Sequence, residues 1–160
     1  MKKITILLLI FCISITCGCQ KQENNSKTDN NQDNIVEENK EMEEFEARIN
    51  ITINNETFSA TLEDNATSRE FIKRLPLNIT MNELNGNEKY YYFNEYLPSN
   101  SSKVGKINSG DIMLYGSDCL VLFYDSFNTS YSYTRIGVLD NPEKLKEIVG
   151  NGNIDVNISK

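Results

Sequence analysis

The chain has no histidine and no tryptophan among its 160 residues, and only 16 basic side chains against 23 acidic ones. Without histidine, the most frequent general base and a frequent zinc ligand are both excluded. Nucleic-acid-binding proteins carry basic patches, so a formal charge of −7 argues against a nucleic-acid partner. Acidic residues are plentiful, but no loop has the spacing of an EF-hand calcium site. We therefore expect neither a metal nor a cofactor.

The N-terminus has the anatomy of a signal peptide. Lys2 and Lys3 precede an apolar run from Ile4 to Ile15, and the chain becomes polar immediately after Cys19. A helix needs about 20 apolar residues to span a bilayer, and this run is clearly shorter. The pattern is typical of a segment that directs export and is then removed.

This segment resembles the type II signal peptides of bacterial lipoproteins, in which a small residue precedes the cysteine that is acylated. Gly18 fits that position before Cys19, whereas Thr16 departs from the leucine-like residue usual three positions before the cysteine. Cys17 is the alternative site, although Thr16 and Ser14 match the pattern less well there. An ordinary secretory signal with incidental cysteines is a further alternative. The resemblance implies cleavage before Cys19, acyl chains such as palmitate on that cysteine, and an extracytoplasmic protein held at the membrane.

A polar, acidic segment follows the signal peptide. Residues 20–47 combine Asn, Gln and acids with almost nothing to bury, so they cannot offset the entropy lost on ordering and are predicted to be a disordered tether. The predicted organisation is a signal peptide at 1–18, a lipidated cysteine with its tether at 19–47, and a folded domain at 48–160. If Cys19 is acylated, Cys119 has no partner for an internal disulfide.

The domain is predicted to consist mainly of short strands. Apolar periodicity and turn residues place strands at 48–54, 57–62, 77–84, 89–93, 111–115, 119–124, 131–139 and 154–158. The run at 119–124 does not alternate, so both of its faces should be covered.

Two short helices are expected between these strands. The first lies within 66–76, where Thr67 and Glu70 have the spacing of a capping box and Pro76 ends the helix. The second begins with Asp140 as its N-cap and ends at Gly150. Many short strands and only two brief helices predict a mainly β fold, a small closed β-barrel.

Four segments follow one another through this domain: TFSATLEDNATSREFIKRLPL (57–77), MNELNGNEKYYYF (81–93), SGDIMLYGSDCLVLFYDSFNTSYSYTRIG (109–137) and DNPEKLKEIVGNGNIDVNI (140–158). With them, the stretch from Ile49 to Ile158 resembles the bacterial cyclophilin-like domain family. The resemblance implies a closed barrel of cyclophilin type with a helix at each end. True cyclophilins isomerise prolyl bonds with an arginine near aromatic residues, a glutamine, a tryptophan and a histidine. Because that set is missing, no catalytic residue is assigned.

Aromatic residues are concentrated in the second half of the domain. Tyr90, Tyr91, Tyr92 and Phe93 lie on one predicted strand, so alternate members face opposite sides of the sheet. These rings either fill the core and ordinary surface, or line a groove that binds a peptide or small ligand. The candidate ligand-binding residues are Glu88, Tyr90, Tyr92, Phe123, Tyr131 and Arg135, with Glu88 and Arg135 as the polar partners. Cys119 is expected to be a small buried residue, since no histidine is present to activate its thiol.

The leading functional hypothesis is a non-catalytic binding module held at the membrane by its lipid. Its partner would be an envelope protein, a peptide or a small molecule. The alternative is a divergent prolyl isomerase-like enzyme that uses Arg135 with a tyrosine or glutamate. An accessory role beside a redox or transport system is a third hypothesis.

Overall fold

The computed structural model describes residues 45–160. The predicted signal peptide, Cys17, Cys19 and residues 20–44 of the predicted tether lie outside the described residues. Within 45–160, neither helix has the length and apolar character needed to cross a membrane. Phe45 precedes the predicted start of the domain, yet it packs against the core. The guanidinium carbon of Arg69 lies over the Phe45 ring, 4.9 Å from the ring centroid.

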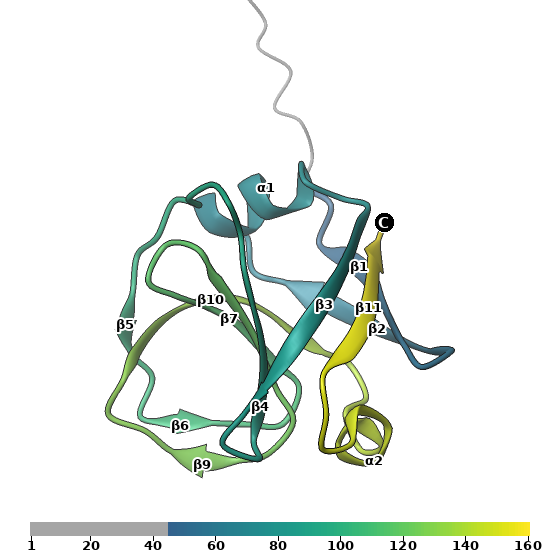
Figure 1. The fold of residues 1–160 in the computed structure, drawn as a ribbon. Coiled ribbons are helices and arrows are strands. Elements are labelled where there is room, and N and C mark those ends of the chain that lie inside the picture. Colours follow the sequence, from purple (N-terminus) through teal and green to yellow (C-terminus); the bar gives the residue numbers. More distant parts are fainter. Residues whose placement is uncertain (1–44) are drawn as a thin grey trace, which may run out of the picture. The chain divides into compact units, whose positions relative to one another are not determined.

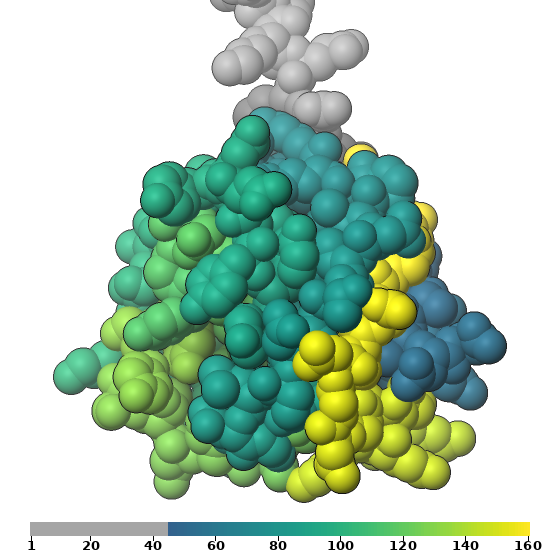
Figure 2. All heavy atoms as spheres, in the orientation of Figure 1, coloured from purple at the N-terminus to yellow at the C-terminus, as the bar shows by residue number. Residues whose placement is uncertain are grey.

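Eight antiparallel strands form a closed barrel (Figure 1). Their order around the barrel is β2 (Glu56–Leu62), β1 (Arg48–Ile53), β11 (Ile154–Ser159), β3 (Leu77–Leu84), β4 (Glu88–Tyr92), β8 (Cys119–Phe123), β7 (Asp111–Tyr115) and β10 (Ser132–Leu139). Pairing of β10 with β2 closes the ring, with Gly137 opposite Leu62. Figure 2 shows β11, in yellow, between β3 and the β1–β2 hairpin. The predicted mainly β, closed barrel with two short helices is confirmed.

Three further strands are too short to be seen in the sequence. The strand β5 (Ser102–Lys103) pairs with β10, and β6 (Lys106–Ile107) pairs with β9 (Phe127–Asn128) beside the barrel (Figure 1). No strand was predicted at these positions, because two residues carry no periodicity.

The two helices, α1 (Ala66–Ile72) and α2 (Leu145–Val149), lie at opposite ends of the barrel (Figure 1). The predicted capping box in α1 is wrong: Asn65 is the N-cap, and its Oδ1 accepts a 2.9 Å hydrogen bond from the Ser68 amide. The Thr67 hydroxyl instead donates to the Pro98 carbonyl at 2.6 Å, which ties α1 to the loop after β4.

The predicted N-cap of the second helix is also wrong. The helix α2 begins after Lys144, and Asp140 instead accepts a 2.7 Å hydrogen bond from the Thr61 hydroxyl and pairs with Arg48. Asp140 is drawn away because β10 runs directly beside β2, which carries Thr61. Gly150 does end the helix, at φ 55°.

The strand β8 is buried on both faces, as its continuous apolar run predicted. Leu120 and Leu122 belong to the core cluster inside the barrel. Cys119, Val121 and Phe123 point outward and form a separate buried cluster with residues from neighbouring strands and loops. This outer cluster is the base on which the candidate site is built.

Lys89 closes one end of the barrel from within. Its ammonium is fully buried and donates to Glu83 Oε2 at 2.5 Å, to the Gly150 carbonyl at 2.9 Å and to the Gly152 carbonyl at 2.6 Å. The Tyr124 hydroxyl donates to the other Glu83 oxygen at 2.8 Å. These contacts fasten the β3–β4 hairpin to the segment between α2 and β11.

Candidate functional site

A groove of about 290 Å³ lies on the outer face of the barrel, over β4, β8 and β7. We call it the tyrosine groove; its lining residues are Leu84, Asn85, Glu88, Tyr90, Tyr92, Tyr115, Cys119, Val121, Tyr131 and Tyr133. Small side chains of β8 form its floor, and tyrosines from the strands on either side form its walls.

The register of the strands explains why a groove forms here. Tyr90 lies opposite Val121 on one side of β8, and Tyr92 lies opposite Cys119. On the other side of β8, Tyr115 also lies opposite Cys119. Because neighbouring strands are about 4.8 Å apart, the backbones that carry the two walls are roughly 9–10 Å from each other. Large rings on both sides of two small side chains therefore leave a trough.

Ring contacts hold each wall in place. On β4, the rings of Tyr90 and Tyr92 pack edge to face at 5.6 Å. On the opposite wall, Tyr115 lies 6.1 Å from Tyr131 and 5.5 Å from Tyr133. Such arrangements are favourable for aromatic pairs, so the walls are ordered by their own packing.

Exposed apolar side chains gather around this groove. Among residues 45–160, six large apolar side chains are exposed, and four of them line it: Leu84, Tyr92, Tyr115 and Tyr131. Single exposed apolar residues are normal on a protein surface, whereas a contiguous group marks a site of interaction. The groove is therefore the best candidate for a binding site on the described surface.

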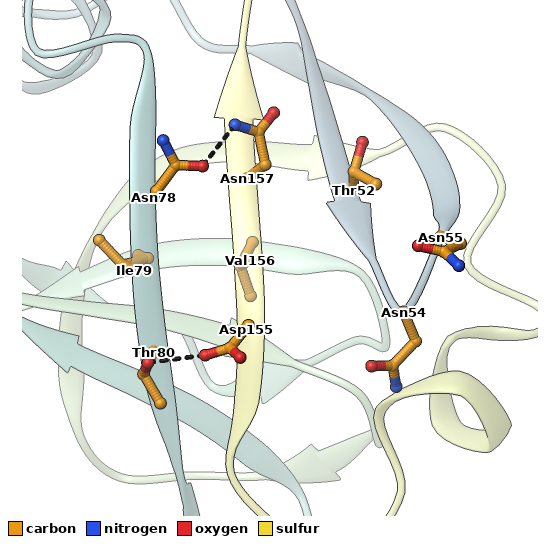
Figure 3. A pocket seen from close by; sticks show the side chains of 9 residues that line it. All are labelled: Thr52, Asn54, Asn55, Asn78, Ile79, Thr80, Asp155, Val156 and Asn157. Atoms are coloured by element: carbon orange, nitrogen blue, oxygen red, sulfur yellow. Dashed lines mark hydrogen bonds between the residues drawn. The ribbon is translucent and has the colours of Figure 1, made fainter.

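A larger hollow, of about 550 Å³, lies on the outer face of β1, β11 and β3 and is open and polar (Figure 3). Its side chains already bond to one another: Asn157 Nδ2 donates to Asn78 Oδ1 at 2.8 Å, and the Thr80 hydroxyl donates to Asp155 Oδ1 at 2.7 Å. Ile79 and Val156 are buried, so the hollow has little apolar surface. A ligand there would have to replace these bonds and water without apolar contact in return. The smaller tyrosine groove is the stronger candidate.

Comparison with known proteins identifies the barrel. The sequence pattern of the Cyclophilin-like family matches residues 51–159, well over half of the chain. The chain belongs to the cyclophilin-like family. No curated protein matches the sequence.

Among solved structures, the cyclophilin-like domain is similar to a chain in the structure of McbB in complex with tryptophan. The TM-score is 0.56 at 16% sequence identity, and the match covers 70% of this chain and 44% of that chain. At this level of identity, the likeness concerns the fold alone.

The cyclophilin-like domain brings together four of the six residues singled out from the sequence: Glu88, Tyr90, Tyr92 and Tyr131. Phe123 does not line the groove. It is fully buried, with its ring 5.5 Å from that of Tyr133 and 5.8 Å from that of Phe127. It lies beside the groove floor, where Ile107 of β6 and Phe127 of β9 belong to the same buried cluster.

Arg135 does not meet Glu88. Its guanidinium lies 3.6 Å from Asp111 Oδ1, and it lines a separate hollow between β10 and the loop after β4. The sequence did not single out Tyr115, Tyr133 and the floor residues Cys119 and Val121 for the site. Only the register of the paired strands shows that these residues lie near Tyr90 and Tyr92, and a single sequence does not specify that register.

Burial and negative charge raise the pKa values of two residues that line the groove. Burial, and then the nearby Glu83 carboxylate, raise the pKa of Glu88 above its ordinary value. Burial, and then Glu88, raise the pKa of Tyr133 to about 12. The lining residues include Glu88 but no Lys or Arg, so the surroundings are dry and negative.

Cys119 is buried on the groove floor, as expected, and is a free thiol. Burial raises its pKa to about 11, from an ordinary value of 9.0, although the neighbouring Tyr92 hydroxyl opposes the shift. A thiol with so high a pKa is almost entirely protonated at neutral pH and is a poor nucleophile.

This raised pKa predicts slow alkylation of Cys119. Near pH 8 the thiolate fraction is about a hundredfold below that of a thiol with a pKa of 9, so iodoacetamide should react about a hundredfold more slowly. The rate should rise about tenfold per pH unit until the pH approaches 11. Mass spectrometry of the peptide that contains Cys119 measures this, with the urea-unfolded protein as the control. A rate that levels off near pH 9 would contradict the assignment.

Proposed function

We propose that this chain is a lipid-anchored, extracytoplasmic protein whose cyclophilin-like domain binds a small ligand or short peptide in the tyrosine groove without catalysing a reaction. The observation that carries the proposal is the gathering of exposed Tyr92, Tyr115, Tyr131 and Leu84 around one groove. The N-terminal sequence around Cys19 supports the anchor.

The geometry of Arg135 supports binding over prolyl isomerisation. The arginine is engaged by Asp111 and lies outside the tyrosine groove. The thiol on the groove floor is protonated at neutral pH. A protease-coupled assay with a proline peptide should therefore show no acceleration above background.

Indole is a suitable probe for the groove, since McbB is described in complex with tryptophan and this chain contains no tryptophan of its own. Ligand fluorescence is then separable from that of the protein, and energy transfer from groove tyrosines to bound indole reports occupancy. We expect saturable transfer for the full chain in a non-ionic detergent, corrected with a detergent blank.

Two exposed tyrosines provide a matched pair of variants. Tyr115 is a groove wall, whereas Tyr96 is 77% exposed and does not line the groove. Because both side chains are exposed, both alanine variants should fold. Tyr115→Ala should weaken indole binding about fivefold by removing one aromatic contact, and Tyr96→Ala should leave it unchanged. Absence of saturable binding, or an equal loss in both variants, would argue against the groove as the site.

A further inference from the structure

The lining of the tyrosine groove has one sign of charge. Within residues 45–160, the groove is lined by five tyrosines, whose rings have electron-rich faces, and by the carboxylate of Glu88, but by no Lys or Arg. We infer that the groove selects a small organic cation, an ammonium group attached to an apolar body. This inference rests on the binding function proposed above and specifies the chemical class of its ligand.

Glu88 is a half-buried carboxylate that is paired with no cation among the described residues. Within residues 45–160, no salt bridge or side-chain hydrogen bond joins Glu88 to another residue. Glu83 and Asp111, by contrast, are paired with Lys89 and Arg135. Removing a carboxylate from water without an opposite charge is unfavourable, so a ligand ammonium would offset the cost of burying Glu88.

Three groove tyrosines, Tyr92, Tyr115 and Tyr131, are exposed and available to such a ligand. In the part of the chain that the structure describes, cation–π contacts involve the rings of Phe45, Phe93 and Tyr124, none of which lines the groove. A cation is attracted to a ring when it lies within about 6 Å of the centroid. The strands that carry the two walls flank β8, so their backbones are roughly 9–10 Å apart and an ammonium bound over the floor has tyrosines on both sides.

The floor supplies the apolar half of the recognition. Val121 and the protonated thiol of Cys119 form a dry base, and Leu84 adds an apolar edge near Glu88. A neutral ligand would gain these contacts but would bury Glu88 further without compensation. An anion would face the Glu88 carboxylate directly and be repelled by it. Affinity should therefore be highest for a cation, lower for a neutral ligand and lowest for an anion.

Three indole derivatives of similar size test this charge order: tryptamine is a cation, tryptophol is neutral and indole-3-propionate is an anion. With the full chain in a non-ionic detergent near neutral pH, tryptamine should bind at least about tenfold more tightly than tryptophol, a difference of about 1.4 kcal/mol. Indole-3-propionate should bind more weakly than tryptophol. Tyr115→Ala should weaken all three if they share the groove.

Charge-removing variants assign the preference to Glu88. Glu88→Gln keeps the shape and should reduce the tryptamine preference to below about threefold. Glu56→Gln removes an exposed carboxylate at the start of β2 and should keep the wild-type preference. Equal affinities of the three ligands for the wild-type chain would overturn the cation inference while leaving groove binding intact. Failure of all three to bind would overturn groove binding itself and the inference with it. The affinities of the three ligands for the wild-type chain test the inference even if Glu88→Gln misfolds.

Discussion

Replacing Lys89 with methionine should lower the free energy of unfolding by about 3–5 kcal/mol, because it removes one partner of a buried charge network. The side chain is fully buried, and its ammonium satisfies Glu83 and the carbonyl oxygens of Gly150 and Gly152. Methionine fills similar space but leaves all three acceptors without this donor, which is the costly way to break such a network. Urea denaturation of the purified variant measures the loss.

Two matched variants and a pH series test this account. Lys103→Met, at an exposed lysine on β5, should change stability by less than about 0.5 kcal/mol. Lys89→Met combined with Glu83→Gln should recover part of the loss, since the side chain at position 83 no longer leaves an unpaired charge. A loss below about 1 kcal/mol in the single variant would mean that water replaces the ammonium.

The pH dependence follows from Glu83. Burial alone would raise the pKa of Glu83, but hydrogen bonds from Lys89, Tyr124 and the Gly86 amide outweigh it and lower the pKa below 4.5. The stabilisation from this pair is therefore fully present above pH 4.5 and is lost as the pH falls through the lowered folded-state pKa. The difference between wild type and Lys89→Met should shrink over the same acid range.

Lys89 also shows where sequence reasoning stops. The strand over 89–93 was correctly predicted, but the sequence does not reveal that Lys89, at its start, faces inward and is bound by carbonyls from a distant segment. Those carbonyls belong to residues 150 and 152, which reach Lys89 only because β11 pairs with β3, the neighbour of β4. Contacts of this kind depend on topology rather than on local pattern.

The barrel itself was predictable because each of its eight longer strands has a local signal. Period-two alternation marked the strands with one buried face, and the unbroken apolar run marked β8. The helix caps were less predictable, since side chains such as Thr67 and Asp140 bond to distant partners, Pro98 and Thr61, in place of the nearest helix amides. Tertiary contacts here override local capping preference.

The sequence predicted that the candidate site is rich in tyrosine, but not which of the outward-facing residues line it. Alternation correctly set Tyr90 and Tyr92 on one face of β4, and these residues do line one groove. Phe123 shares that outward face but is covered, and Arg135 is held by Asp111 beyond the groove wall. Which outward-facing residues stay open depends on where the segments with β6 and β9 fold over the sheet, and their polar sequence gives no sign of it.

Replacing Cys19 with alanine should move the protein entirely from the membrane fraction to the aqueous fraction and abolish acyl labelling. The proposed anchor places several acyl chains on this one residue, and a single chain alone gives only marginal, reversible membrane binding. The apolar run from Ile4 to Ile15 is shorter than the roughly 20 residues that a spanning helix requires, so it should not replace the lipid. Fractionation with labelled palmitate measures both effects.

Cys17→Ala is the matched control, because it removes the neighbouring cysteine and leaves Gly18 and Cys19 intact. This variant should remain membrane-bound and labelled. If labelling is instead lost in Cys17→Ala and kept in Cys19→Ala, the acylated residue is Cys17, and the tether begins two residues earlier. If the wild-type protein takes up no label and is found in the aqueous fraction, the segment is an ordinary secretory signal. In that case the tyrosine groove belongs to a released protein, and its ligand need not be sought at the membrane surface.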